Sequence, residues 1–157
     1  LQELYNRSLE GTTGNMPLSS TEVKNMADQL IWFADPRLIK LIMKDDELIG
    51  FLFAYPDISA AVQRTRGRLF PFGWIDLLLE RKRTRWVNIN GAAIVEKYRG
   101  LGGTAVLFNE MYQSIREGNF LYADLVQIGV ENEKMQRELR DLGIDFYKVH
   151  RMYEKIL

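Results

Sequence analysis

The fold of this chain is decided by the stretch Ile94-Val95-Glu96-Lys97-Tyr98-Arg99-Gly100-Leu101-Gly102-Gly103-Thr104. An apolar, strand-like run ends here in a glycine-rich turn, and a helical pattern follows directly. Glycines let the backbone approach a ligand closely, and the free N–H groups at a helix N-terminus suit negatively charged oxygens. Arg99 adds a permanent positive charge beside them. The stretch therefore predicts a phosphate-binding turn between a strand and a helix.

The order of strand, Tyr98-Arg99-Gly100, a further glycine and helix resembles the first motif of the GNAT acyltransferase superfamily, which holds the pyrophosphate of acyl-coenzyme A. A second match follows where Val130-Glu131-Asn132 opens a helix that ends at Leu142-Gly143. The resemblance implies an α/β fold with a mixed, mostly antiparallel sheet flanked by helices. It also implies an N-acyltransferase that uses acetyl-coenzyme A or another acyl-coenzyme A, without a metal, and transfers the acyl group to an amine.

Two other interpretations of the turn stay open. Gly100, Gly102 and Ala105 also satisfy the dinucleotide fingerprint G-x-G-x-x-[GA], and Asp124 lies at a suitable distance to hold a ribose. That fold expects further strand-helix units, for which little chain remains. A plain strand-to-helix turn without a ligand is the other interpretation. The second match, at Asn132, favours the acyltransferase.

Composition limits the function classes. The chain has 157 residues, 46% of them hydrophobic, which fits one domain over residues 1–157. Its 21 basic and 21 acidic residues cancel, so the overall charge does not favour nucleic acid. The absence of cysteine and the presence of one histidine argue against a metal centre. We find no membrane-spanning run or signal peptide and expect a cytoplasmic location. Because the chain starts at Leu1, it could be a fragment of a longer protein.

Hydrophobic periodicity and capping signals predict the remaining elements. The predicted helices are Leu1–Glu10, a helix capped by Ser19 and Glu22, Thr104–Glu117 and Glu133–Leu142. The predicted strands are Leu38–Lys44, Leu48–Tyr55, Trp86–Val95, Leu121–Ile128 and a terminal strand over Asp145–Leu157. The first two strands form an antiparallel hairpin. This order is that of the GNAT fold without its first strand.

An insertion over residues 56–85 separates the third and fourth strands of that fold. It contains a predicted helix near Ile58–Arg64 and an amphipathic segment over Trp74–Arg83. Together with the closing residues 151–155, it resembles the C-terminal domain of an uncharacterised bacterial group of GNAT-like proteins. Apolar and basic side chains over residues 69–85 suit a lid or a membrane-interface segment, whereas a helix packed on the sheet with a solvated basic end is the plainer alternative.

The resemblance also implies the coenzyme contacts. The N–H groups from Arg99 to Thr104 would bind the pyrophosphate, and Ala93, Ile94 and Val95 would pair with the pantetheine arm where the fourth and fifth strands separate. Asn132 would lie near the coenzyme, although it is also an ordinary helix N-cap. The run over residues 88–93 indicates either a β-bulge or only weak strand propensity, and the two interpretations are about even.

No catalytic residue is predicted from the sequence. The tyrosine that often acts as general acid in this superfamily lies seven residues beyond the asparagine, where this chain has Leu139. Tyr147, Tyr153 and Glu131 are weak candidates, because such residues more often serve packing or the helix dipole. A catalytically degenerate module that binds coenzyme A or another protein is therefore the alternative function.

Overall fold

The computed structural model describes residues 19, 21–22, 24–25, 34–126, 128–151, 153 and 155. They fall into two units, residues 1–126 and 127–157, which we describe separately. The helix predicted over residues 1–10 lies outside the described residues. The Ser19 hydroxyl accepts a hydrogen bond from the Glu22 N–H at 3.2 Å, and the Glu22 carboxylate accepts one from the Ser19 N–H at 2.8 Å. The predicted capping box is therefore confirmed.

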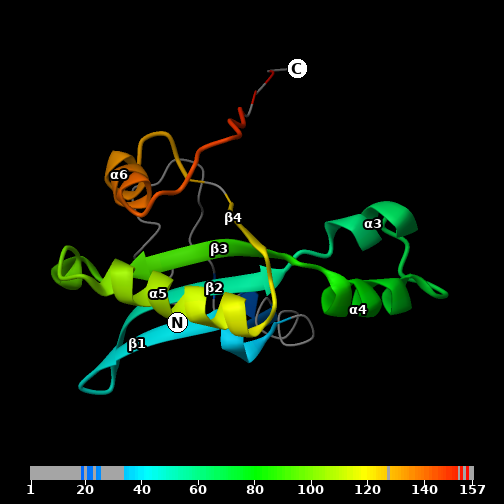
Figure 1. The fold of residues 1–157 in the computed structure, drawn as a ribbon, viewed down its shortest axis with the longest axis horizontal. Helices are drawn as coiled ribbons and strands as arrows, with labels where there is room; N and C mark the ends of the chain where they lie inside the picture. Colours follow the sequence, from blue (N-terminus) through cyan, green and yellow to red (C-terminus); the bar gives the residue numbers. More distant parts are fainter. Residues whose placement is uncertain are drawn as a thin grey trace. The chain divides into compact units, whose positions relative to one another are not determined.

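A mixed sheet forms the frame of the first unit (Figure 1). Among the described residues it has four strands in the order β1 (Ile39–Lys44), β2 (Glu47–Pro56), β3 (Trp86–Ile94) and β4 (Tyr122–Leu125). β2 runs antiparallel to both β1 and β3, and β4 runs parallel to β3. Asp45 and Asp46 both have positive φ, as two-residue hairpin turns require. The predicted β1–β2 hairpin is thus confirmed.

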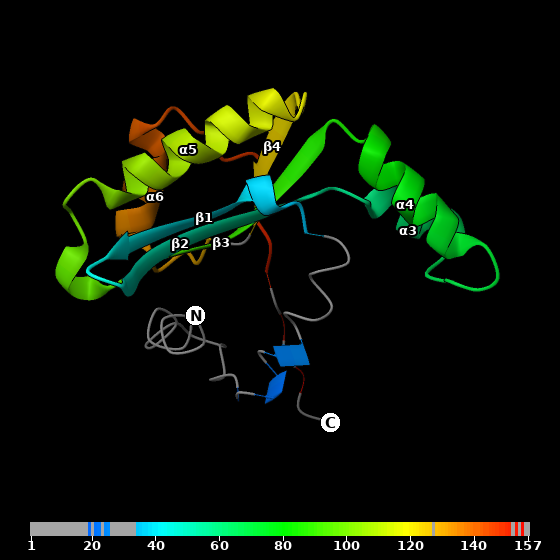
Figure 2. The same cartoon turned by 90° about the horizontal axis from the view of Figure 1, so that it is seen from below.

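The core of the first unit lies between the sheet and α5 (Gly103–Glu117), which connects β3 to β4. Figure 2 shows α5 covering one face of the sheet. Leu107 and Met111, one helical turn apart, are buried on the inner side of α5. They form one cluster with Leu38, Leu52, Ala54, Val87 and Ile89. Because this cluster fixes α5 against β3, it also fixes the turn that joins them.

The insertion forms two helices, α3 (Ser59–Thr65) and α4 (Gly73–Arg83), which confirms the helices predicted there. Figures 1 and 2 show both extending away from the sheet. They pack on each other, and Ala61 and Leu77 are their buried residues. The interpretation of this segment as a helix packed on the sheet is therefore wrong. α3 has seven residues and covers only one side of α4.

The second unit contains α6 (Glu133–Asp141). The side chain of Asn132 accepts a hydrogen bond from the Met135 N–H at 3.1 Å and so caps this helix as expected. Gly143 follows the helix with a φ of +78°, the left-handed conformation that often ends helices.

The terminal strand predicted over Asp145–Leu157 is wrong for the residues that the structure describes. Residues 144–151 are neither helix nor strand. A strand needs a partner for its backbone groups, and the described part of this unit offers none. Phe146, Tyr147 and Val149 are exposed, so the alternating apolar pattern does not correspond to a buried face.

We expect Met111→Ala to lower the free energy of unfolding by about 2–5 kcal/mol, because it removes a fully buried side chain from the main cluster. The neighbouring exposed residue provides the control: Tyr112→Ala should change the stability by about 0.5 kcal/mol or less. Urea denaturation followed by circular dichroism measures both. Equal effects of the two substitutions would contradict the described core.

Candidate functional site

The glycine-rich turn between β3 and α5 is exposed. A short 3-10 helix, η2 (Glu96–Tyr98), leads into it, and Arg99, Gly100, Leu101 and Gly102 are all exposed. Gly100 and Gly102 have φ values of +80° and +86°, and a Cβ added at either would meet no atom within 4 Å. These glycines are required by backbone conformation rather than by crowding. The space above the turn is open to a ligand.

The backbone N–H groups of this turn are available. Within the described part of the chain, those of residues 100–105 donate no hydrogen bond. The next N–H group, that of Val106, donates to the Gly102 carbonyl oxygen at 3.1 Å and begins the helical pattern. Free N–H groups and the positive end of the α5 dipole favour an anion at this position.

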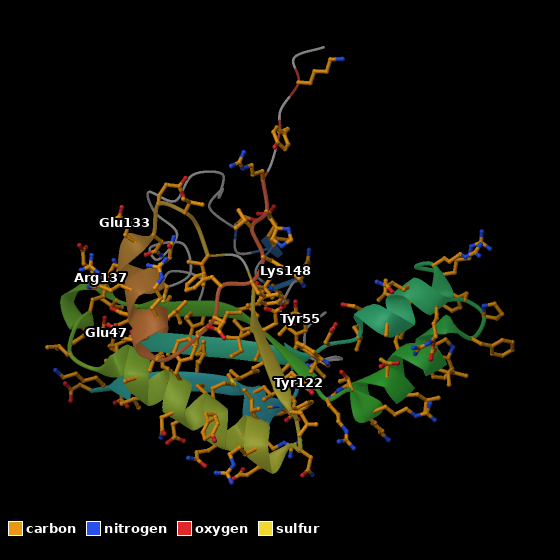
Figure 3. The ribbon with its side chains drawn as sticks, turned by 45° about the horizontal axis from the view of Figure 1, so that its top comes forward. Glu47, Tyr55, Tyr122, Glu133, Arg137 and Lys148 are labelled. Atoms are coloured by element: carbon orange, nitrogen blue, oxygen red, sulfur yellow. The ribbon has the colours of Figure 1, made fainter. Side chains whose placement is uncertain are left out.

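Tyr98 anchors the turn to the β1–β2 hairpin. The Nζ atoms of Lys44 and Lys97 lie 4.9 and 4.7 Å from the centroid of its ring, which places one cation from β1 and one from η2 against the same ring. The Lys97 Nζ also contacts the carboxylate of Glu47 at 3.2 Å. Glu47 is labelled in Figure 3. Hydrogen bonds to Tyr98 and then to Glu47 raise the pKa of Lys97. Both lysines therefore add positive charge near the turn.

Arg99 connects the turn to the end of β3. Its Nε donates a hydrogen bond to the Ile94 carbonyl oxygen at 3.0 Å. This bond brings the guanidinium next to the strand end. The predicted positive charge therefore lies between the strand and the free N–H groups.

β3 and β4 pair at one end only. The parallel register joins Trp86 to Tyr122 and continues to Ile89 and Leu125. A last hydrogen bond runs from the Val126 N–H to the Ile89 carbonyl oxygen at 3.0 Å. Beyond Ile89, β3 continues to Ile94 with β2 as its partner on one side and, among the described residues, none on the other. The expected separation of these two strands is present.

A β-bulge lies where the strands part. Phe53 pairs with Gly91 while the adjacent Ala54 pairs with Ile89, so Asn90 is an extra residue on β3. Of the two interpretations of residues 88–93, the β-bulge is therefore the one that the structure shows. The Val95 N–H donates to the Ile49 carbonyl oxygen on β2. Since backbone groups alternate along a strand, those of Ala93 also face β2.

The backbone groups of Ala92 and Ile94 consequently face the open edge. The contact of Arg99 with the Ile94 carbonyl oxygen agrees with this direction. Of the three residues expected to pair with a pantetheine arm, Ile94 thus presents its backbone to the open side, while Ala93 and Val95 bond toward β2. Ala92 was not predicted, because the residue that shifts the alternation cannot be identified from the sequence.

Comparison of the sequence with known proteins finds distant relatives. No protein-family model matches the chain. It is 27% identical over 163 residues to Protein YghO of Escherichia coli, and 26% identical over 164 residues to the bacterial ceramide synthase of Caulobacter vibrioides. These matches cover 99% and 100% of this chain but 41% and 42% of the relatives. The chain thus spans about two fifths of the length of these relatives.

A solved structure decides the fold. The aminoglycoside N-acetyltransferase AAC(6')-Iy, in complex with a bisubstrate analogue of coenzyme A and acetylneamine, matches with a TM-score of 0.61 and 16% identity. The match covers 99% of this chain and 89% of the enzyme. The chain has the GNAT acyltransferase fold. Further chains described as acetyltransferases match with TM-scores of 0.60 to 0.63.

The GNAT fold excludes the interpretation of the glycine-rich turn as part of a dinucleotide-binding fold. A dinucleotide-binding fold is built on a mostly parallel sheet, whereas two of the three strand pairs described here are antiparallel. Asp124 lies within β4 and pairs in register with Asn88. The fingerprint match at Gly100, Gly102 and Ala105 is therefore coincidental.

The remaining candidate residues belong to the second unit. Asn132 is occupied as a helix cap, and Glu131 is exposed. Tyr147 is exposed with Lys148 Nζ 4.7 Å from its ring centroid, and Tyr153 is 86% exposed. Leu139, which stands where many GNAT enzymes have a tyrosine, is fully buried.

Two negative findings apply to the described residues. They contain no cluster of three histidine, aspartate or glutamate side chains that could hold a metal ion. No described helix is both long and apolar enough to cross a bilayer.

The close contact between Gly91 and Phe53 at the bulge can be tested by substitution. A Cβ at position 91 would lie 2.2 Å from the Phe53 Cε1 atom, so Gly91→Ala should destabilise the chain by about 1–3 kcal/mol. Combining it with Phe53→Ala removes the clash, and the double variant should be more stable than the sum of the single effects by at least about 1 kcal/mol. Urea unfolding of the four proteins measures this coupling. Simple additivity would mean that Phe53 does not cover Gly91.

Proposed function

We propose that this chain is the coenzyme-binding domain of an acyl-CoA-dependent N-acyltransferase. The observation that carries the proposal is the run of six backbone N–H groups over residues 100–105 that donate no hydrogen bond to any described residue, next to the edge of β3 that no described strand pairs with. An anion and an extended chain could thus be bound side by side. Coenzyme A contains both: its pyrophosphate is the anion, and its pantetheine arm is the extended chain.

The coenzyme contacts follow from this arrangement. The backbone from Arg99 through Gly100, Leu101, Gly102 and Gly103 to Thr104 would bind the pyrophosphate, aided by the positive charge of Arg99. The amide groups of pantetheine would pair with the backbone groups of Ala92 and Ile94 on β3, since those of Ala93 and Val95 face β2. Asn132 is a further proposed coenzyme contact.

The reaction would be a direct attack. The amine nitrogen forms a bond to the thioester carbonyl carbon, the carbon–sulfur bond breaks, and the thiolate leaves with a proton transferred from the amine. Glu131 is a candidate base for that proton, and Tyr147 and Tyr153 are candidate acids for the thiolate. The burial of Leu139 and the lack of a hydroxyl there mean that any donor must come from another residue.

For the acceptor, we propose an amine with a long apolar chain. One relative is named a bacterial ceramide synthase, and ceramide is a long-chain amine in amide linkage with a fatty acid. The similar acetyltransferase in complex with acetylneamine supports an amine acceptor in general. The cluster of exposed apolar side chains on the insertion supports a hydrophobic one.

The second candidate function is a degenerate GNAT module that binds coenzyme A without transferring an acyl group. The specific observation in its favour is Leu139, which is buried where many GNAT enzymes have a proton donor. Both candidates predict coenzyme binding, and only the enzyme predicts turnover.

Coenzyme binding is tested by thermal shift. Acyl-CoA at about a hundred times its Kd should stabilise the chain by about 2.7 kcal/mol and raise Tm by several degrees. Gly102→Glu should abolish this rise, because a carboxylate would enter the anion site. Gly67→Glu is the matched control, since Gly67 also has a positive φ and open space around it but lies in the insertion. A rise that survives Gly102→Glu would locate the coenzyme elsewhere.

Turnover separates the two candidates. We expect mass spectrometry to detect an amide product when the chain is incubated with palmitoyl-CoA and sphinganine, and much less product when ethanolamine replaces sphinganine. If no product forms with either amine while the coenzyme still raises Tm, the result favours the degenerate module. Equal yields with both amines would contradict the long-chain acceptor.

A further inference from the structure

The insertion carries a cluster of exposed apolar side chains, which we call the insertion face. Phe70 and Phe72, in the loop between α3 and α4, are 84% and 71% exposed. The complete set is Leu69, Phe70, Phe72, Trp74, Ile75, Leu78 and Leu79. Seven exposed large apolar side chains within residues 69–79 point to a partner.

The orientation of α4 against α3 explains why the insertion face is exposed to solvent. Arg64 of α3 binds Asp76 at 2.8 Å and also contacts Glu80, so the acidic side of α4 faces α3. The hydrogen bond from Arg64 lowers the pKa of Asp76. With 3.6 residues per turn, Trp74 and Leu78 then lie on a different side from the two acids, as do Ile75 and Leu79.

Basic side chains frame the insertion face. Residues 59–85 contain seven basic and two acidic residues, a net charge of +5 in a chain whose total is zero. Both acids are bound to Arg64, and Arg81 donates a hydrogen bond to the Ala34 carbonyl oxygen at 3.0 Å. The other basic residues flank the face in the sequence: Arg66, Arg68, Lys82, Arg83 and Arg85. The partner of this surface should therefore be anionic and should accept aromatic rings.

An anionic lipid bilayer meets both requirements. Aromatic and apolar side chains enter the boundary between headgroups and acyl chains, while lysine and arginine bind the lipid phosphates. A second copy of the insertion would bring like charges together. A nucleic acid could stack on the aromatic rings but would leave the aliphatic side chains without an apolar environment: Leu69, Ile75, Leu78 and Leu79. We propose that the insertion face docks this chain on the surface of an anionic bilayer.

Binding to vesicles tests the proposal without any acyl-CoA, and so independently of the proposed function. The chain should co-sediment with phosphatidylcholine vesicles that contain about 30 mol % phosphatidylglycerol, and much less with pure phosphatidylcholine. Its tryptophan emission should shift to shorter wavelength on binding. Trp74→Phe should remove that shift, whereas Trp86→Phe should retain it.

Two variants separate the contributions. The double variant Phe70→Ser, Phe72→Ser should reduce partitioning at least about tenfold. The triple variant Lys82→Gln, Arg83→Gln, Arg85→Gln should reduce it on the order of a hundredfold for the anionic vesicles. The control triple variant Lys44→Gln, Arg116→Gln, Lys148→Gln changes the net charge equally at exposed positions elsewhere and should bind normally. Circular dichroism verifies that each variant is folded.

Several results would overturn the proposal. Failure of the wild-type chain to bind either kind of vesicle would overturn it. Equal losses of vesicle binding in the two triple variants would also overturn it. A dimer that dissociates in the Phe70→Ser, Phe72→Ser variant, without vesicle binding by the wild type, would assign the face to self-association. None of these results depends on whether the glycine-rich turn binds coenzyme A.

Discussion

The separation of β3 from β4 after Ile89 is the constraint on which the site depends. Leu107 and Met111 pack in one cluster with Val87 and Ile89, so the core holds α5 where the two strands are still paired. Past that point β3 has five more residues and β4 has none. Backbone groups without a partner must be satisfied by water or a ligand. Among the described residues, the difference in strand length together with the bulge at Asn90 therefore leaves an unpaired edge of β3 without any specialised side chain.

Local signals in the sequence predicted most of the fold. The capping box at Ser19, the hairpin turn and the positive φ of the turn glycines depend on residues close to one another in the chain, where short-range rules are strong. Long-range contacts were not predicted. The position of Lys44 over the Tyr98 ring joins residues that are far apart in the sequence, and the side of β3 that faces outward depends on which residue forms the bulge.

Two errors have a common physical origin. The terminal segment after Gly143 alternates like a strand, and α4 has the periodicity of a helix that packs on a sheet. In both cases periodicity shows which residues share a face but not what covers that face. Phe146 remains exposed because the described part of the second unit has no strand to pair with, and Leu78 remains exposed because the short α3 covers only the other side of α4.

Recognition by backbone and catalysis by side chains impose different demands on a sequence. The proposed anion site at residues 100–105 requires two positive φ angles and the start of a helix. Gly100 and Gly102 supply the two φ angles, and the side chain of Leu101 between them is exposed and is not needed for this conformation. Proton transfer requires a particular titratable group at a particular place, and the burial of Leu139 shows that one such place is filled by a hydrocarbon side chain. A chain can therefore keep the backbone geometry of the proposed anion site while position 139 carries no titratable group. Binding and turnover must be measured as separate properties.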